Sequence, residues 1–487
     1  MTSDNRKKIV IVGGGITGLA AARAVAIAAP GVEVTVLEAA DRLGGKIVTI
    51  REDGFVIEGG PESYLAAKSW MTDLCAELGL AGELEGTRPE NRGSRVLWGG
   101  RLLPIPDGLS GLVPTRLRPI VTSPLLSPAG KARIALDWVL RPRTDANDES
   151  LERFISRRLG RQAYERLIEP LMAGIYAGDG SQLSTIATFP QLRAAEREHG
   201  GIIRGVIANR KRAQASGAPP RAGFVTPTGG MGRIVEALTA DLVGRGVALR
   251  TGVTVSRLVR SEEGAAYRYL VRTASGEELP ADGLILTTPA PVTADLLADD
   301  GHGLAPIAGA NLRHVPHVNS VTLSLAFHRR DIDHPLRGYG YVVPRVQRRP
   351  ILASTWTSSK WAGRAPDGQT VLRFYIGRVG GRDGIALTDD EIQELALAEM
   401  RDVLRVDATP TRRWVSRWPG GSPQYTVGHV ERIAEAERRV AAIPGLAIAG
   451  CSYHGVGIPD CVRSGERAAH RVVSHVAPAS AAPNPPA

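Results

Sequence analysis

The pattern of apolar and polar positions near the N-terminus predicts a strand, a tight turn, a helix and a second strand. Apolar residues run without interruption over Ile9–Val12, as in a buried strand. Glycines follow at positions 13, 15 and 18, and the alanine-rich stretch Leu19–Ala29 predicts a helix packed on the sheet. A second apolar run is closed by Glu38, 20 residues after Gly18.

This glycine turn indicates a site for a dinucleotide. Glycines let the backbone N–H groups at a helix start approach a pyrophosphate, whose negative charge the helix dipole favours. Glu38 stands where a carboxylate accepts hydrogen bonds from an adenosine ribose. A turn whose glycines serve close packing alone would leave Glu38 unexplained. We therefore expect a bound dinucleotide, with NAD and FAD both open at this point.

The remaining pattern divides the chain into three parts. Glycine turns and short apolar runs recur on both sides of a central helical stretch. The predicted fold class is α/β: a Rossmann-like cofactor-binding domain (1–65, 224–291 and 432–476), an α+β substrate domain (66–91 and 292–431) and a helical insertion (92–223). The composition of residues 209–223 predicts an exposed mobile loop, and that of residues 477–487 a disordered tail.

The amino-acid composition limits the cellular compartment and the classes of binding partner that we expect for this protein. The three cysteines show no CxxC spacing, which argues against a disulfide framework or a zinc site and favours the cytoplasm. No run of about 20 apolar residues predicts a membrane span. Lysine and arginine number 60 against 50 acidic residues, which suits an anionic substrate or, at most, peripheral contact with a membrane. Nucleic acid is not expected, because aromatic residues do not interleave with the basic ones.

A second glycine loop, near the C-terminus, favours a flavin over a nicotinamide cofactor. Gly450, Gly455 and Gly457 let the backbone approach a planar ring, and Pro459 and Asp460 suit the first turn of a helix. The start of that helix directs partial positive charge at the ring and stabilises its reduced, anionic form. The other interpretation of this loop is a further αβ turn.

Seven stretches of the chain resemble the flavin oxidases of the protoporphyrinogen oxidase family, which share the amine oxidase fold. They are GGGITGLAAA at 13–22, DRLGGK at 41–46, GGPESYL at 59–65, GIYAGDGSQLS at 174–184, TPTGGMGRIVEAL at 226–238, PQYTVGH at 423–429 and GCSYHGVGIPDCVRSG at 450–465. The first, second and fifth are shared with amine oxidases and carotene desaturases. The fourth, sixth and seventh favour porphyrinogen oxidation.

Within that family, Lys46 and the turn at 60–63 resemble the Gram-positive bacterial branch, whose members are coproporphyrinogen III oxidases. The mitochondrial branch tends to have arginine or asparagine at the position of Glu62. The resemblance implies oxidation of coproporphyrinogen III to coproporphyrin III in haem biosynthesis, with non-covalent FAD. Three hydride transfers to flavin N5 would remove six electrons, and molecular oxygen would reoxidise the flavin and give hydrogen peroxide. It also suggests transient contact with the next haem-pathway enzyme.

The resemblance also assigns residues to the cofactor. The turn at 13–18 would hold the pyrophosphate, Glu38 the ribose, the turn at 60–63 the flavin, and the C-terminal loop the border of the ring. No side chain is assigned to catalysis. The implied cofactor residues are Gly13, Gly14, Gly15, Ile16, Thr17, Gly18, Glu38, Gly45, Lys46, Gly60, Pro61, Glu62, Ser63, Val253, Cys451, Val456, Gly457 and Ile458.

Substrate propionates need cations at the mouth of the site. Lys68, which soon follows the flavin-lining turn, and Arg95 are the candidates, while Arg92, Arg101 and Arg204 are weaker ones. The other interpretation of each is a solvated surface position. No catalytic role is expected for two histidines and four tryptophans. We expect a structural role for His429 and a surface position for His454. Core packing is expected for at least three of Trp356, Trp361, Trp414 and Trp418.

Other functions remain open on the same motifs. Protoporphyrinogen IX is an alternative substrate, and amine oxidases and carotenoid desaturases share the fold. A binding protein of the Rab GDP-dissociation-inhibitor type would keep the fold without redox chemistry. Intact glycine loops at both ends of the chain argue against this last alternative.

Overall fold

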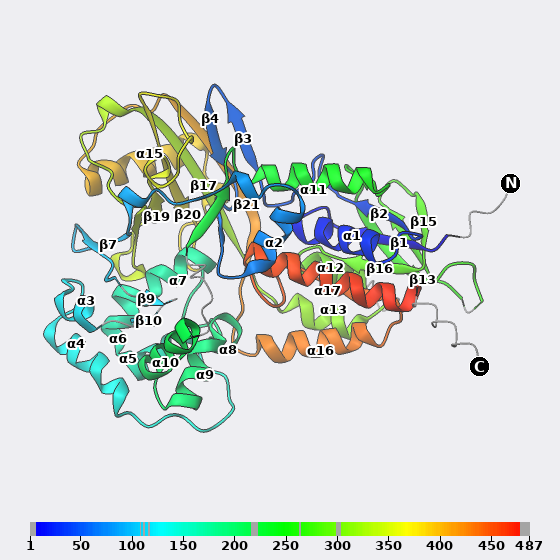
Figure 1. Cartoon of the computed structure of the whole chain (residues 1–487), viewed down its shortest axis with the longest axis horizontal. Coiled ribbons are helices and arrows are strands. Elements are labelled where there is room, and N and C mark those ends of the chain that lie inside the picture. The colour runs from blue at the N-terminus through cyan, green and yellow to red at the C-terminus, as the bar shows by residue number, and fades with distance from the viewer. Residues whose placement is uncertain are drawn as a thin grey trace.

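A parallel sheet of five strands carries the first glycine turn (Figure 1). The computed structural model describes residues 6–107, 109–110, 113–114, 117–215, 223–262, 264–298 and 303–477. The strands lie in the order β12 (Ala248–Arg250), β2 (Glu33–Leu37), β1 (Lys8–Val12), β16 (Gly283–Leu286) and β22 (Leu446–Ile448). Segments far apart in the sequence therefore pair within one sheet.

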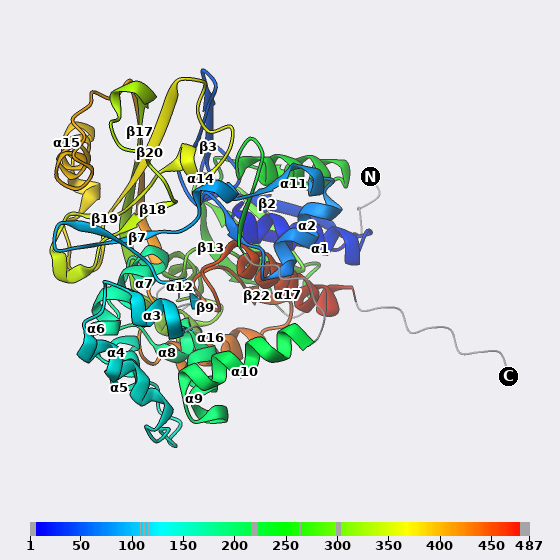
Figure 2. The same ribbon diagram turned by 60° about the vertical axis from the view of Figure 1, so that its left-hand side comes forward.

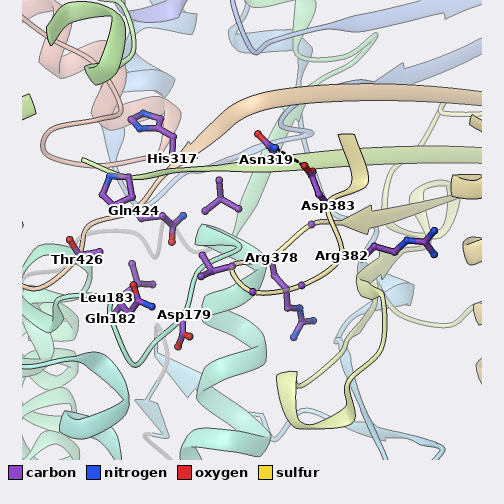
Figure 3. A pocket seen from close by; sticks show the side chains of 16 residues that line it. Asp179, Gln182, Leu183, His317, Asn319, Arg378, Arg382, Asp383, Gln424 and Thr426 are labelled. Atoms are coloured by element: carbon purple, nitrogen blue, oxygen red, sulfur yellow. Dashed lines mark hydrogen bonds between the residues drawn. The ribbon is translucent and has the colours of Figure 1, made fainter. Parts of the chain in front are cut away.

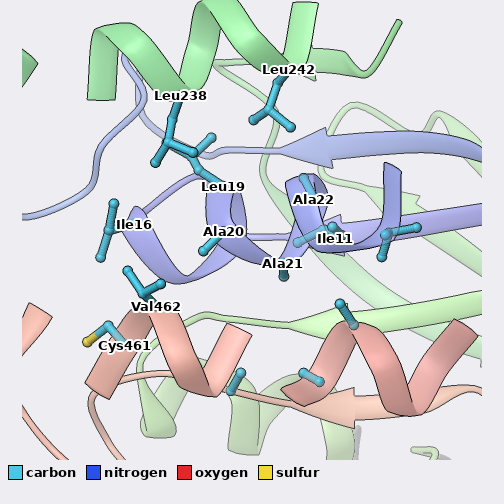
Figure 4. Close-up of a cluster of buried hydrophobic side chains, with 14 of the residues drawn as sticks. Ile11, Ile16, Leu19, Ala20, Ala21, Ala22, Leu238, Leu242, Cys461 and Val462 are labelled. Atoms are coloured by element: carbon cyan, nitrogen blue, oxygen red, sulfur yellow. The ribbon is translucent and has the colours of Figure 1, made fainter. Parts of the chain in front are cut away.

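Both faces of this sheet are covered, which explains why β1 is apolar over most of its length. On one face, Ile9 and Ile11 pack under α1 (Ile16–Ala28), α11 (Gly232–Gly244) and α17 (Ile458–Val476) (Figure 4). The alanines of α1 allow a close approach of α17, where a Cβ at Gly465 would lie 2.3 Å from the carbonyl oxygen of Thr17.

The other face of the sheet packs against three helices and a small antiparallel sheet, which enclose Val10 and Val12. The helices are α12 (Ala290–Ala298), α13 (Pro306–Arg313) and α16 (His429–Ala441). The small sheet consists of β13 (Val255–Arg260), β14 (Tyr269–Thr273) and β15 (Glu278–Ala281).

A second large sheet, of seven strands, forms the α+β unit (Figure 2). Alternate residues of its long strand β17 (His317–His328), from Val321 to Phe327, are buried in a core that α15 (Asp389–Glu399) helps to cover. Its strand order is β21 (Arg412–Pro423), β17 (His317–His328), β20 (Gln369–Ile376), β19 (Ile351–Thr355), β18 (Gly340–Val342), β7 (Arg95–Trp98) and β8 (Arg101–Pro104).

A helical unit completes the molecule. The Arg158 guanidinium and the Asp137 carboxylate form a fully buried ion pair at 2.6 Å, and Asp137 also accepts the backbone N–H of Ile203. These contacts connect the helices that contain Arg158 and Ile203 to the segment that contains Asp137. The helices of the unit are α3 (Leu117–Thr122), α4 (Pro128–Ala135), α5 (Leu151–Leu159), α6 (Arg161–Ala163), α7 (Glu169–Tyr176), α8 (Thr185–Thr188), α9 (Pro190–His199) and α10 (Ile202–Ala215).

Short elements connect these units. They include a hairpin of β3 (Thr49–Glu52) and β4 (Phe55–Glu58), a small sheet of β5 (Tyr64–Leu65), β11 (Phe224–Pro227) and β6 (Leu84–Gly86), the pair β9 (Leu109–Ser110) and β10 (Val113–Pro114), and the helices α2 (Ser69–Glu77) and α14 (Thr357–Lys360).

Two boundaries differ from those predicted. The helical insertion was placed from residue 92, but β7 pairs in parallel with β18, so β7 and β8 belong to the seven-stranded sheet. The substrate domain was placed from residue 292, but α12 and α13 pack in the core of the parallel-sheet unit. In both cases the sequence around the boundary does not specify which sheet or core the segment packs against.

Parts of two predictions lie outside the described residues. These are 216–222 of the loop expected to be mobile and 478–487 of the expected tail, whereas 209–215 belong to α10. Among the helices that the structure describes, none is both long enough and apolar enough to span a bilayer.

Candidate active site

A cavity of about 500 Å³ lies at the carboxyl ends of the parallel strands, where open α/β sheets bind ligands. It brings the two glycine regions together, although more than 400 residues separate them in the sequence. The predicted cofactor residues that line it are Gly13, Gly15, Ile16, Thr17, Glu38, Gly45, Lys46, Pro61, Val253, Cys451, Val456 and Ile458. The predicted cofactor residues that are not among its described lining residues are Gly14, Gly18, Gly60, Glu62, Ser63 and Gly457.

The first glycine turn excludes larger side chains. Gly13 has a φ of +109°, and a Cβ there would lie 2.6 Å from the hydroxyl oxygen of Thr287. At Gly18 a Cβ would lie 1.9 Å from the carbonyl oxygen of Gly13. Gly15 is the N-cap of α1, and no side chain caps this helix. The backbone N–H groups of its first turn are therefore available to an anionic ligand.

Glu38 is fixed in the cavity by the backbone. Its two carboxylate oxygens accept N–H groups of Gly14 at 2.6 Å and of Ala40 at 2.9 Å. A carboxylate offers about four lone-pair positions, so both oxygens can still accept hydroxyl groups of a ligand. Its own carbonyl accepts the N–H of Val253, which brings that residue to the cavity wall beside it.

The turn at 60–63 is built tightly against the cavity. A Cβ at Gly60 would lie 1.7 Å from the carbonyl oxygen of Lys46, and Arg373 donates to the carbonyl of Gly60 at 2.6 Å. Pro61 reaches the cavity, but the buried Glu62 side chain instead forms an ion pair with Lys360. Burial favours the neutral carboxyl, yet the charges of Lys360 and Arg373 hold the pKa of Glu62 below its ordinary value.

The C-terminal loop closes the other end of the cavity. Gly457 is the N-cap of α17, and Pro459 lies in the first turn of this helix, as predicted. The Tyr425 hydroxyl donates to the carbonyl of Cys451 at 2.5 Å and accepts the N–H of Gly455 at 2.8 Å, which fixes the loop. A hydrogen bond from the Cys461 thiol and the nearby Lys46 ammonium lower the pKa of Cys451 to about 6, against the effect of burial.

The family model for flavin containing amine oxidoreductases matches residues 16–473. The chain belongs to this family. It is 36% identical to a coproporphyrinogen III oxidase of Bacillus subtilis (strain 168), over 97% of this chain and 99% of that protein. It is 33% identical to a coproporphyrinogen III oxidase of Staphylococcus aureus (strain NCTC 8325 / PS 47), over 96% and 100%. A solved structure from Exiguobacterium sp. 255-15 is 36% identical, with a TM-score of 0.83, over 96% and 98%. The resemblance and the fold class inferred from the sequence are confirmed.

Within this flavin oxidoreductase, the two candidate substrate cations lie apart from each other. The Lys68 ammonium pairs with Asp460, in the first turn of α17, at 2.5 Å. Arg95 lines a separate cavity of about 300 Å³, together with Arg92 and Arg337. The weaker candidates Arg101 and Arg204 lie on β8 and α10. None of these cations is among the described residues that line the main cavity.

The histidines and tryptophans occupy structural positions, as predicted. The buried His429 donates from Nε2 to the carbonyl of Tyr453 at 2.9 Å and stacks on Tyr425, while the exposed His454 pairs with Glu437. Burial lowers the pKa of His429 to about 4. The indole N–H of the fourth tryptophan, Trp418, donates to the carbonyl of Gly59, and the three buried ones are Trp356, Trp361 and Trp414.

Some cavity residues were not predicted. Thr287 and Thr288 follow β16, and their place at the carboxyl edge of the sheet was a usable signal. The Thr287 hydroxyl donates to the carbonyl of Gly13 at 2.9 Å. Ile175 and Tyr176 come from the end of α7, and the signal that could have found them is the family stretch at 174–184 that contains both residues.

A neighbouring cavity of about 350 Å³ lies where β17, the loop after β20 and the loop after α7 meet (Figure 3). Asn319 donates to Asp383 at 3.2 Å across one side, and Arg378 lies on the same loop as Asp383. His317 lines this cavity and hydrogen-bonds through Nε2 to the hydroxyl of Ser452, which lines the main cavity. The hydrogen-bonded side chains of His317 and Ser452 therefore lie between the two cavities.

Proposed function

We propose that this flavin oxidoreductase is an FAD-dependent coproporphyrinogen III oxidase, which forms coproporphyrin III and uses molecular oxygen as acceptor. The observation that carries the proposal is the near full-length similarity to coproporphyrinogen III oxidases, in a chain whose cavity joins both glycine regions. Six electrons are removed per porphyrin, and hydrogen peroxide is released.

The residues of the cavity fit FAD. The uncapped start of α1 suits the pyrophosphate, the free lone pairs of Glu38 suit the ribose, and the backbone of Val253 suits the adenine. The turn at 60–63 and the C-terminal loop would border the ring. We propose non-covalent binding, because the Cys451 sulfur is engaged with Lys46 and Cys461.

Bound flavin supplies a hydride acceptor for the bridging carbon of a porphyrinogen. The protein's own part is to hold the substrate flat, exclude water and position its carboxylates. Apolar side chains on the cavity wall suit this task, and one of them, Ile175, is half exposed. The wall also contains Val292, Leu296, Val456 and Ile458.

We further propose that Lys68 and Arg95 contact substrate propionates. Lys68 would exchange its partner Asp460 for a propionate, and Arg95 would act from the separate cavity that it lines with Arg92 and Arg337. Lys68→Ala and Arg95→Ala should each raise KM about 10-fold with a smaller change in kcat. Arg330→Ala, at a largely exposed position, is the control that should leave KM unchanged. Unchanged KM in both test variants would remove this assignment.

An aerobic assay with two porphyrinogens tests the main proposal. The purified yellow protein is given coproporphyrinogen III or protoporphyrinogen IX, and porphyrin fluorescence and hydrogen peroxide are followed. We expect faster turnover of coproporphyrinogen III, well above the rate of autoxidation. Faster turnover of protoporphyrinogen IX would reverse the substrate assignment. Peroxide release with amines alone would indicate an amine oxidase, and a colourless protein that FAD does not reconstitute would indicate a binding protein.

A further inference from the structure

Two cysteines line the wall of the main cavity. Cys451 is in the loop after β22, and Cys461 is in the first turn of α17. A hydrogen bond from the Cys461 thiol is the largest cause that lowers the pKa of Cys451. The Lys46 ammonium donates to the same sulfur at 3.5 Å. A sulfur with two donors directed at it is well placed to carry negative charge.

We propose that Cys451 and Cys461 form an oxidisable dithiol that reacts with hydroperoxides, with Cys451 as the attacking and Cys461 as the resolving cysteine. This reaction is separate from porphyrinogen oxidation, for which neither thiol is needed. It makes the loop that borders the cofactor cavity a site of reversible modification.

The chemistry is balanced without a further oxidant. The Cys451 thiolate attacks one oxygen of hydrogen peroxide, the O–O bond breaks, and a sulfenic acid and hydroxide form. The sulfur of Cys461, having given its proton to the hydroxide, then attacks the Cys451 sulfur and displaces its oxygen as hydroxide. The products are the disulfide, one water and one hydroxide. The two sulfurs lose two electrons, which reduce the peroxide.

Neighbouring groups support each step. Lys46 offsets the charge of the attacking thiolate, and the lowered pKa of Cys451 leaves it mostly ionised at pH 7. The hydrogen bond to Cys451, burial and the charge of Cys451 raise the pKa of Cys461 well above its ordinary value. Cys461 therefore keeps its proton until the first step has removed the charge of Cys451. Both cysteines line the main cavity, so a small peroxide would reach them beside the bound flavin.

The third cysteine is an internal control. Cys75 is buried in another part of the core, and its neighbour in hydrogen-bonding range is the Tyr64 hydroxyl, at 3.9 Å. Burial raises the pKa of Cys75 to about 11. The more acidic Cys451 has far more thiolate at pH 7, but its thiolate is the weaker nucleophile. From these two opposing effects we expect Cys451 to react about 100-fold faster than Cys75.

The experiment treats the flavin-loaded full-length protein with hydrogen peroxide at pH 7, without porphyrinogen, and maps the cysteines by mass spectrometry. We expect a Cys451–Cys461 cross-linked peptide that dithiothreitol reverses, and oxidation of Cys451 about 100-fold faster than that of Cys75. In Cys461→Ser, Cys451 should stop at a sulfenic acid that dimedone traps. In Cys75→Ser, the cross-link should form as in the wild type.

The proposal is overturned if the wild-type protein forms no such cross-link, or if Cys451 and Cys75 oxidise at equal rates. Because these readouts come from the unmodified chain, they do not depend on the folding of a variant. A further arm replaces added peroxide with porphyrinogen turnover in air, with and without catalase. This arm rests on the proposed function: a cross-link with added peroxide but not during turnover would support the dithiol and count against peroxide release at the flavin.

Discussion

Glu38 is the side chain on which cofactor affinity should depend most directly. Replacing its carboxylate by an amide, in Glu38→Gln, removes the charge and half of the acceptor capacity. Hydrogen bonds to a charged group contribute about 1.5–3 kcal/mol, so we expect FAD to bind about 10- to 100-fold more weakly. Titration of the apoprotein, followed by flavin fluorescence, measures the Kd.

Glu33→Gln is the matched control for this change. Glu33 begins the same strand, β2, but it pairs with Lys8 at 3.7 Å and lies away from the cavity. Its substitution should leave the Kd for FAD unchanged. Equal affinity in Glu38→Gln and the wild type would show that the ribose is not held by this carboxylate.

His429 should make stability depend on pH. Burial depresses its pKa in the folded protein to about 4, below the value of about 6.5 in the unfolded chain. Its contribution is therefore present above pH 6.5 and is lost as pH falls from 6.5 to 4, by about 3 kcal/mol in total. In His429→Gln, an amide can keep the hydrogen bond to the carbonyl of Tyr453 without titrating.

The midpoint of thermal unfolding, measured from pH 7 to pH 4.5, separates the two proteins. The wild-type midpoint should fall more steeply than that of His429→Gln, because the variant lacks the proton that the unfolded wild type takes up. Parallel curves would mean that this imidazole is not the group responsible.

The strand–turn–helix element depends on backbone contact at Gly18. A Cβ at this position would come within 1.9 Å of the Gly13 carbonyl oxygen and 2.9 Å of the Thr287 hydroxyl. Gly18→Ala should therefore destabilise the protein by about 2–4 kcal/mol and weaken flavin retention, since the turn must open. Gly31→Ala is the control, because a Cβ there meets nothing within 4 Å, and it should be neutral. Thermal unfolding of both variants measures the difference, and a wild-type midpoint in Gly18→Ala would contradict this packing argument.

At the level of helices and strands, the periodicity of the sequence predicted the type of an element better than its neighbours in the fold. The segment of β7 and β8 was assigned to the helical insertion, but β7 pairs with β18, which lies more than 200 residues away in the sequence. The helices α12 and α13 were assigned to the wrong unit because an amphipathic helix does not specify which core its apolar face covers. The glycine turns were better predicted, since their function requires a fixed local spacing.

At the scale of the whole molecule, the proposed cofactor would contact segments that are far apart in the sequence and so stabilise the fold. The cavity wall draws on residues from near both ends of the chain and from the helical unit. FAD at 100 times its Kd should stabilise the folded protein by about 2.7 kcal/mol and raise the midpoint of thermal unfolding by a few degrees. Riboflavin at the same concentration lacks the ADP half that the first glycine turn would bind, so a much smaller rise is expected. Equal shifts would mean that this turn does not contribute to binding.

The amino-acid sequence alone established the glycine turns, the acid that follows them, the fold class and the family, because these features depend on short spacings and local periodicity. Only the tertiary structure decides which side chains contact one another across the site. Lys68 reaches Asp460, Glu62 turns to Lys360, and Cys451 lies against Lys46, over separations of about 300 to 400 residues. Such pairs follow from how sheets and helices pack in three dimensions, and no local pattern encodes them.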